Sequence, residues 1–148
     1  MQLSQKCQYA LRAVFELAVR AKESPVKVGD ISESQAIPLR FLEVILNQMK
    51  RGGFVESRRG PSGGYALARP AAELTMGEIM RFVEGPFQPV SCVTGRTEER
   101  CSLYGKCVFL EVWDEAGKAM ADVFDRTTFA DLVKRSKHKG LYVSSYCI

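Results

Sequence analysis

Three of the five cysteines in this 148-residue chain stand in one polar segment, as Cys92, Cys101 and Cys107. In a reducing compartment, cysteines grouped in this way more often bind a metal or sense redox state than form structural disulfides. An iron–sulfur cluster usually takes four thiolate ligands, so three local cysteines leave one coordination position for another group. The spacing is also compatible with a zinc site, a thiol–disulfide switch, or cysteines that have no chemical role.

The other two cysteines are predicted to behave differently. Cys7 falls in the first turn of an expected helix, in line with Leu11 and Val14, and this position predicts a buried structural thiol. Cys7 is at the same time a conditional candidate for a fourth cluster ligand. Cys147 falls in a C-terminal tail that we expect to be mobile.

Residue types that support catalysis are scarce in this chain. The single histidine is His138, near the start of the expected tail, and no Ser/His/Asp, Cys/His or paired-carboxylate pattern stands out. We therefore predict that the protein is not an enzyme and has no small-molecule substrate. No apolar run approaches the ~20 residues of a membrane-spanning helix, and the N-terminus lacks the apolar core of a signal peptide. These features predict a cytoplasmic protein without a membrane partner.

The charge is unevenly distributed along the chain. Residues 1–70 carry 11 Lys and Arg against 6 Asp and Glu, whereas residues 71–148 carry 10 against 11. A basic N-terminal half suits a nucleic-acid partner, although a solvated basic face would give the same counts.

The N-terminal half has the element pattern of a DNA reader. We expect a helix from Ser4 to about Lys22, a short strand at 26–28, a helix at 29–35, a turn, and a helix from Pro38 to Gly52. Such a helix-turn-helix can place its second helix in the major groove. Leu39, Arg40 and Glu43 are its predicted exposed residues, with Phe41 on the apolar face. Arg can pair with guanine and Glu can accept from the cytosine amino group.

A predicted β-hairpin follows directly, with strands at 54–58 and 65–68 joined by a Gly-rich turn. A hairpin in this position is either a plain surface hairpin or the wing of a winged helix-turn-helix domain. In a wing, the two arginines of the turn can contact phosphates or enter the minor groove, and the glycines let the backbone approach DNA closely. The candidate DNA-binding residues of the wing are Arg58, Arg59, Gly60 and Ser62.

The C-terminal half is predicted to be helical on both sides of the cysteines. Thr75 is expected to cap a helix that ends near Glu84, and residues 109–126 predict a long helix with a broad apolar stripe. A twin helix from a second subunit would bury the stripe, and packing on its own domain is the alternative. The candidate dimerisation residues are Phe109, Val112, Trp113, Ala116, Met120, Val123 and Phe124. A short last helix is expected from Thr128 through Val133.

Together these elements predict a mainly α fold with a small β wing (α+β), in which a winged helix-turn-helix domain is followed by a long dimerisation helix. The expected units are 1–85 for the DNA-binding domain, 86–108 for a cysteine-rich cluster-binding loop, 109–134 for the dimerisation helix and short terminal helix, and 135–148 for a flexible tail.

Five motifs resemble those of the bacterial Rrf-type winged-helix regulators, typified by IscR, NsrR, RirA and CymR. They are Gln8-Tyr-Ala-Leu-Arg12, Ile37-Pro-Leu-Arg-Phe-Leu-Glu43, Arg59-Gly-Pro-Ser-Gly-Gly-Tyr65, Leu74-Thr-Met-Gly-Glu-Ile79 and Thr127-Thr-Phe-Ala-Asp-Leu132. The resemblance covers about residues 1–134 and implies a homodimeric transcription factor that binds double-stranded operator DNA. It also implies an iron–sulfur cluster, 2Fe–2S or 4Fe–4S, on Cys92, Cys101 and Cys107, and DNA contacts by Arg59 and Glu43.

The chain departs from the ligand patterns of these regulators. The gap between Cys92 and Cys101 is eight residues, longer than in IscR. Leu110 stands where IscR-like members have a histidine, and Gln8 stands where NsrR-like members have an acidic residue. The resemblance predicts a repressor whose cluster senses iron, redox state or nitric oxide. The alternative is a metal-free thiol-based or cysteine-metabolism repressor of the CymR kind.

Overall fold

The computed structural model describes residues 2–23, 25–93 and 101–140, and the predicted mainly α fold with a small β wing is confirmed. The elements in chain order are α1 (Gln5–Val19), η1 (Ala21–Glu23), α2 (Val28–Gln35), α3 (Leu39–Arg51), β1 (Val55–Arg58), β2 (Gly64–Leu67), α4 (Met76–Glu84), η2 (Ser91–Val93), α5 (Leu110–Asp125) and α6 (Phe129–His138). Within the described ranges, no helix combines the length and apolarity that crossing a bilayer requires.

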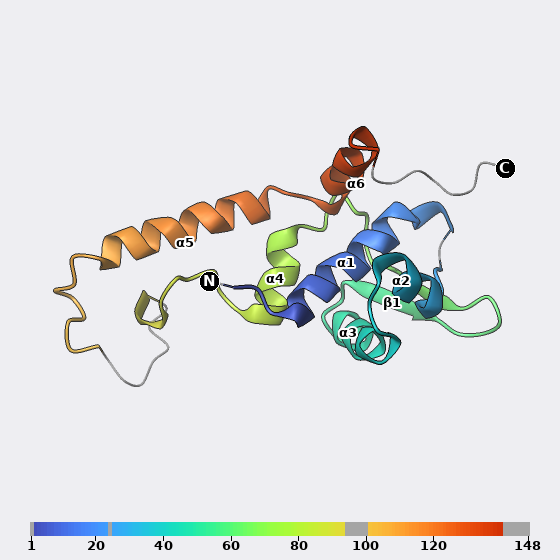
Figure 1. The fold of residues 1–148 in the computed structure, drawn as a ribbon, viewed down its shortest axis with the longest axis horizontal. Coiled ribbons are helices and arrows are strands. Elements are labelled where there is room, and N and C mark those ends of the chain that lie inside the picture. The colour runs from blue at the N-terminus through green and yellow to red at the C-terminus, as the bar shows by residue number, and fades with distance from the viewer. Residues whose placement is uncertain (1, 24, 94–100, 141–148) are drawn as a thin grey trace.

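Helix α1 is the centre of the N-terminal half of the chain and packs against α2, α3, α4 and α6 (Figure 1). Its inward side carries Ala10, Ala13 and Val14, all fully buried, and the small alanines allow neighbouring helices to approach closely. The predicted cap is present, because the Ser4 hydroxyl accepts a hydrogen bond from the Cys7 N–H at 3.1 Å. The helix ends earlier than predicted, and a 3₁₀ turn takes the place of its expected last residues.

The small sheet pairs β1 with β2 as an antiparallel hairpin, which confirms the predicted hairpin. The strand predicted at 26–28 is only partly present. Val26 forms a single bridge to Tyr65, with two backbone hydrogen bonds of 2.8 Å, and Val28 already begins α2. A Cβ on Gly64 would overlap the Val26 carbonyl oxygen, so the bridge requires glycine at this point of the sheet.

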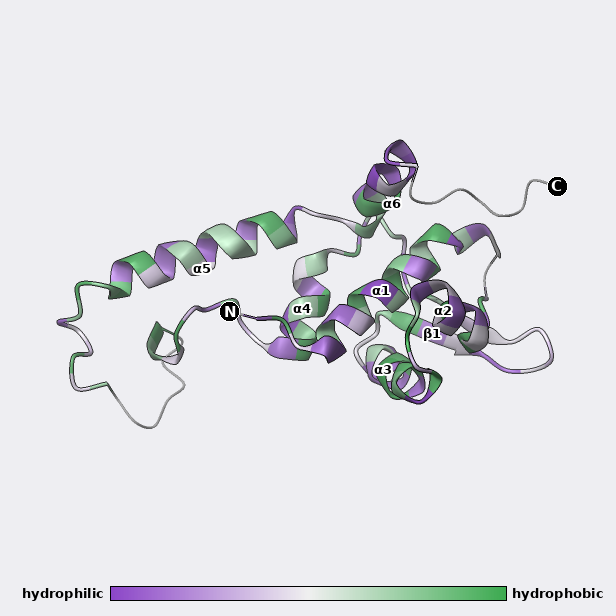
Figure 2. Ribbon diagram, viewed as in Figure 1, coloured by the Kyte–Doolittle hydropathy of each residue, from purple (hydrophilic) through white to green (hydrophobic). Residues whose placement is uncertain are grey.

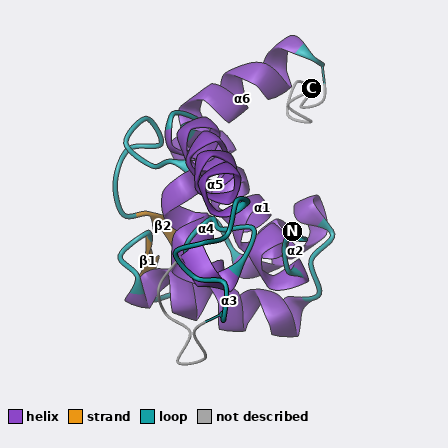
Figure 3. Cartoon of the chain, turned by 90° about the vertical axis from the view of Figure 1, so that its left-hand side faces the viewer, coloured by secondary structure: helices purple, strands orange, loops and turns teal. Residues whose placement is uncertain are grey.

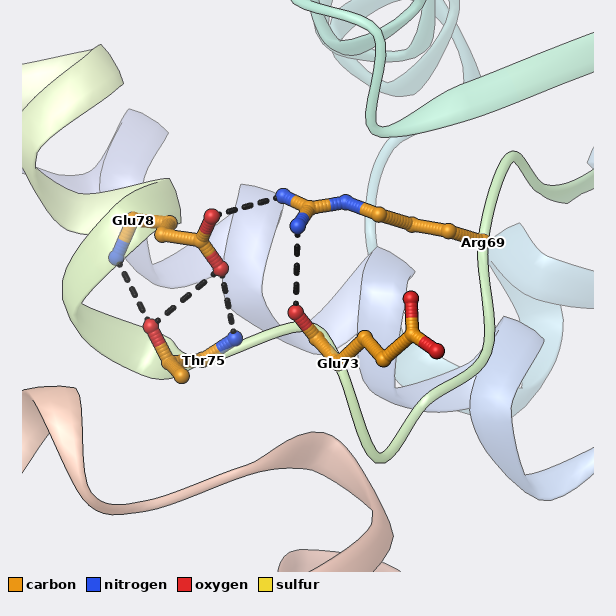
Figure 4. Close-up of polar contacts among 4 residues, drawn as sticks. All are labelled: Arg69, Glu73, Thr75 and Glu78. Atoms are coloured by element: carbon orange, nitrogen blue, oxygen red, sulfur yellow. Dashed lines mark hydrogen bonds and ion pairs between the residues drawn. The ribbon is translucent and has the colours of Figure 1, made fainter.

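A polar network fixes the exit from the wing onto α4 (Figure 4). The Thr75 hydroxyl accepts from the Glu78 N–H at 3.2 Å, and the Glu78 carboxylate accepts from the Thr75 N–H at 3.0 Å, as predicted for a capping box. Arg69 donates to the same carboxylate at 2.7 Å and to the Glu73 carbonyl at 3.1 Å. Partial burial acts to raise the pKa of Glu78, but the hydrogen bonds from Arg69 and Thr75 outweigh it and hold this pKa below its ordinary value.

Helix α6 returns to the N-terminal half of the chain instead of standing apart from it. Phe129 is fully buried in the same core as α1 and α3, and Thr75 bridges to Thr128. The predicted end at Val133 was wrong, because the helix continues to His138; residues 135–138 are therefore helical and not part of a tail. Basic side chains in the last turn favour this continuation through the helix dipole. The expected tail beyond residue 140, with Cys147, lies outside the described residues.

Candidate nucleic-acid interface and cysteine segment

Helix α3 presents a broad outward face next to the wing. As predicted, Leu39, Arg40 and Glu43 are exposed at its N-terminal end, while Leu42, Ile45, Leu46 and Met49 are buried against the domain. Phe41 was predicted on the buried face and is instead 63% exposed. Those four residues fill the contact between α3 and the core, so the ring of Phe41 lies at the edge of this contact and remains largely in solvent.

The turn between α2 and α3 is held by side chains as well as by the backbone. Ala36 takes a left-handed conformation (φ 48°), which is unusual without glycine and closes α2 tightly. The Ser32 hydroxyl donates to the Ile37 carbonyl at 2.6 Å, and the Ile37 N–H donates to the Ser32 carbonyl at 3.0 Å. These bonds set the direction in which α3 leaves the turn.

A buried carboxylate, which sequence reasoning missed, anchors the end of α2 to α1. Glu16 is fully buried, and it meets the Arg20 guanidinium at 2.6 Å and the Gln35 side-chain amide at 2.7 Å. Arg20 also donates to the Ser34 hydroxyl at 2.8 Å. A buried charge is tolerated only when it is paired in this way. Glu16 lies among apolar residues in the sequence of α1, but a charged residue is ordinarily expected at the surface, so its burial could not be recognised from the sequence.

The wing carries the predicted basic turn in an accessible position. Arg58, Arg59, Gly60 and Ser62 are all exposed. Gly60 has a φ of 108°, a conformation that favours glycine, and its carbonyl accepts from the Gly63 N–H at 2.9 Å. The turn is therefore compact, and its basic side chains are exposed to solvent rather than buried in the core.

The structure places the three candidate cluster ligands at different depths. Cys92 lies in η2 and is half-buried, Cys101 is exposed, and Cys107 is half-buried just before α5; all three are free thiols. Residues 94–100, which connect the first two, lie outside the described ranges. Among the residues that are described, no three His, Cys, Asp or Glu side chains are close enough together to hold a metal ion.

Cys7 is fully buried, as predicted for a structural thiol. It lies in a second apolar cluster with Met80 and Phe87, against which Met120 and Phe124 of α5 also pack. Burial, with a smaller contribution from the nearby Glu84 carboxylate, raises the pKa of Cys7 to about 11. Because a metal ligand must be a thiolate, this position gives no support to the hypothesis that Cys7 is a fourth ligand.

Apolar and polar residues alternate along α5 (Figure 2), and the predicted apolar residues are divided between two sides of the helix. Met120 and Phe124 face the protein's own α4 and Cys7 region, where the rings of Phe124 and Phe87 lie 5.2 Å apart. Val112 and Val123 are 55% and 46% exposed. The seven predicted dimerisation residues therefore fall into two groups, those that pack within the subunit and those that remain exposed, which include Phe109. Trp113 and Ala116 are half-buried and lie between the two groups.

Two further contacts attach α5 to the rest of the chain. At its C-terminal end Asp125 forms an ion pair with Arg81 of α4, and the Arg81 guanidinium lies over the Phe87 ring at 5.0 Å. At its middle, a Cβ on the buried Gly117 would lie 2.7 Å from both the Phe87 carbonyl oxygen and the Gln88 side-chain oxygen. The chain that leads to Cys92 therefore crosses α5 at a point where only glycine fits.

A helix-turn-helix followed by a two-stranded wing and a projecting helix defines a winged helix DNA-binding protein. The chain belongs to the Rrf2 family, described as iron-dependent transcriptional regulator, which it matches over residues 3–135. The protein is thus a transcriptional regulator that binds DNA, and the family is not one of enzymes.

Three relatives place the chain more closely within this family. It is 32% identical to the HTH-type transcriptional regulator IscR of Serratia proteamaculans over 90% of this chain and 79% of that protein. The structure of CymR, the global cysteine regulator of B. subtilis, shares 30% identity and a TM-score of 0.75 over 91% of this chain and 98% of that one. The structure of T. potens IscR shares 29% identity and a TM-score of 0.75 over 99% of this chain and 95% of that one.

Proposed function

We propose that the protein is a homodimeric repressor that acts in the cytoplasm and binds operator DNA through α3 and the wing. The observation that carries this proposal is the exposed N-terminal end of α3, where Leu39, Arg40 and Glu43 are accessible, together with the exposed basic turn of the wing. The N-terminal residues of such a helix reach base edges in the major groove, while wing arginines contact phosphates or the minor groove. The candidate contacts of the wing are Arg58, Arg59, Gly60 and Ser62.

Dimerisation through α5 is supported by the side of that helix that its own domain leaves open. Val112, Ala116, Ala119 and Val123 follow the spacing i, i+4, i+7 and i+11, which puts them on one side of the helix. The valines and Ala119 are exposed. An exposed apolar strip along a projecting helix is typical of an interface between subunits, and a two-fold pair of readers suits a palindromic operator.

We further propose that an iron–sulfur cluster, held by Cys92, Cys101 and Cys107, controls operator binding. The donor set fits such a cluster: the three thiols are free, and none lies deep in the core. A bound cluster would supply a group that is altered by oxygen, nitric oxide or iron shortage. Cys92 lies in η2, which contacts α5, and Cys107 directly precedes α5. A ligand on these thiols would therefore act on both ends of a segment that is attached to the dimerisation helix.

A metal-free thiol repressor is the second candidate function. It is supported by the similarity to the cysteine regulator CymR and by the absence, among the described residues, of three side chains gathered for a metal. In that case the accessible thiols at Cys101 and Cys107 would change oxidation state without any metal, and the same segment would transmit the change to α5.

Anaerobic purification separates these two candidates. We expect a brown protein with visible absorption and with iron and sulfide in equal amounts, and we expect Cys92→Ala, Cys101→Ala and Cys107→Ala each to lose that absorption. A colourless wild-type protein without iron would support the thiol repressor instead. If all three variants keep the wild-type spectrum, the cysteine segment is not the cluster site.

Operator affinity tests the regulatory half of the proposal. A duplex selected from a random pool by the wild-type dimer would be titrated with the cluster-loaded and the cluster-free protein. We expect about a 5- to 150-fold difference in affinity, the range of ordinary coupling free energies. Equal affinities would show that the segment holds a metal but does not control DNA binding.

A further inference from the structure

Helix α3 exposes a β-branched apolar residue where solvent-facing helices usually carry a charged or amide side chain. Val44 is 65% exposed, and its position has two unfavourable consequences. It leaves apolar surface in water, and valine has a lower helix propensity than the long polar residues. The residue does not contribute to the core, which Leu42, Ile45, Leu46 and Met49 complete.

The position of Val44 on the helix shows what it can contact. Arg40, Val44, Asn47 and Arg51 follow the spacing i, i+4, i+7 and i+11, so they form one line along the outward face of α3. All four are exposed. Fully buried Met49 lies on the opposite side of the helix. Val44 thus stands at the centre of the exposed face, between two cations and next to the amide of Asn47.

We propose that Val44 contacts the C5-methyl group of a thymine in the operator and makes that base pair a determinant of specificity. This inference rests on the proposed docking of α3 in the major groove. The thymine methyl is the apolar group that base edges present there, whereas the other distinguishing groups are hydrogen-bond donors and acceptors. An apolar side chain in a line of hydrogen-bonding ones therefore selects the base pair that carries a methyl.

The spacing also locates the thymine relative to the base that Arg40 contacts. Val44 lies four residues beyond Arg40, about 6 Å along the helix axis, which corresponds to roughly two base-pair steps of about 3.4 Å. The thymine should therefore stand within one or two base pairs of the Arg40 contact in each half-site. Glu43, one position before Val44, faces the neighbouring side of the same line.

Leu39 and Phe41 are the other large exposed apolar residues of α3, and Phe41 is the one exposed to the same extent as Val44, but its position is different. It follows Arg40 directly, which turns it about 100° away from Arg40 and about 60° away from Val44 around the helix axis. Phe41 therefore lies at the margin of the outward face, and it serves as a matched control for a general apolar effect on DNA binding.

The test uses the full-length dimer and a duplex that the wild-type protein has selected from a random pool. Each thymine of the half-site is replaced in turn by deoxyuridine, which removes the methyl group and leaves every hydrogen-bonding group in place. For the wild-type protein we expect one such replacement to weaken binding about fourfold, the effect expected for one buried methyl or methylene group. For Val44→Ala, which removes both γ-methyl groups, we expect the same replacement to have a clearly smaller effect.

Two further variants complete the experiment. Val44→Thr keeps the shape of the side chain and one methyl group, and we expect it to retain part of the deoxyuridine effect. Phe41→Ala should retain all of it. Since Val44 is exposed, its truncation leaves no cavity, and circular dichroism would confirm that the Ala variant is folded.

The outcomes separate this inference from the function on which it rests. If the wild-type protein selects an operator and Val44→Ala shows the same deoxyuridine effect at every thymine, Val44 does not read a methyl, although DNA binding by α3 stands. Loss of the effect in Phe41→Ala but not in Val44→Ala would also overturn the assignment. If the wild-type protein selects no sequence at all, the proposed function fails and this inference fails with it.

Discussion

Replacing Val112 with glutamate should dissociate the proposed dimer without unfolding the subunit. Val112 is 55% exposed on the side of α5 that faces away from α4, so a charge there costs little in the isolated subunit. Met120 and Phe124 are poor positions for the same experiment, because both pack against the buried cluster around Cys7. A charge at either of them would damage the subunit itself.

The size of the effect follows from the exposed area and the two-fold symmetry. Complete burial of a valine side chain contributes about 1.5–3 kcal/mol, and about half of this remains to be gained at Val112 when the dimer forms. Each dimer contains two copies, so the loss is about 1.5–3 kcal/mol before the desolvation of two carboxylates is added. The dimer dissociation constant should therefore rise by at least about 10- to 150-fold.

Sedimentation equilibrium over a range of protein concentrations measures this constant directly. Lys118→Glu is the matched control, because it introduces the same residue on the polar side of α5, where Lys118 pairs with Asp114. That exposed pair contributes little to stability, and we expect Lys118→Glu to associate like the wild-type protein. Equal association of Val112→Glu and the wild type would refute the assignment of this side of α5, as would a wild-type protein that is monomeric at tens of micromolar.

Three further outcomes are expected. Arg59→Ala should weaken operator binding and, if Arg59 contacts a phosphate, lower the slope of log affinity against log salt by about one. The control is Lys134→Ala on α6, which lies on the side of the molecule opposite α3 (Figures 1 and 3) and should leave affinity and slope unchanged. An unaltered slope for Arg59→Ala would remove this residue from the interface. Iodoacetamide at pH 8 should modify Cys101 rapidly and leave Cys7 unmodified in the folded protein, since burial raises the pKa of Cys7 to about 11; early alkylation of Cys7, seen by mass spectrometry, would contradict its core position. Because the pKa of Cys7 is higher in the folded than in the unfolded protein, the free energy of unfolding should not change below about pH 9 and should fall between about pH 9 and 11. Gly117→Ala should destabilise the protein by roughly 1 kcal/mol, since overpacking against the Phe87 carbonyl exceeds the helix-propensity gain of alanine. Gly29→Ala is the control, because the structure leaves room for a Cβ there, and it should stabilise the protein by a similar amount. Urea unfolding curves of both variants at one protein concentration would compare them, and equal shifts of the same sign would refute the close approach at Gly117.

Local patterns were sufficient to predict the helices, the wing and the caps. The capping box at Thr75 and the hairpin around Gly60 depend on neighbours within a few residues, and such signals can be read directly from a sequence. The same holds for the burial of Cys7, which follows from its place in a helical apolar pattern.

Features that depend on distant parts of the chain could not be predicted in this way. The burial of Glu16 requires Gln35 as a partner, 19 residues away. The division of the α5 stripe depends on where Gln88 crosses Gly117. The exposure of Phe41 depends on how much of the core the other residues of α3 already fill. The length of α6 was underestimated because the buried position of Phe129, which holds the helix on the domain, is a property of tertiary packing.

Helix α5 is attached along its C-terminal half, from Gly117 to Asp125, so its N-terminal half can act as a lever. The helix has 16 residues and is about 24 Å long. Its C-terminal end is fixed by Arg81 and by the Met76 N–H, which donates to the Thr127 carbonyl at 2.9 Å. Seven residues, or about 10 Å, separate the contact at Gly117 from Leu110, so a tilt of about 10° around that contact would move the Leu110 end, beside Cys107, by about 2 Å. Two readers on a palindromic operator must stay about 34 Å apart. In a symmetric dimer, a small displacement of the two α5 ends beside Cys107 would therefore change the distance between the two α3 helices that contact the DNA.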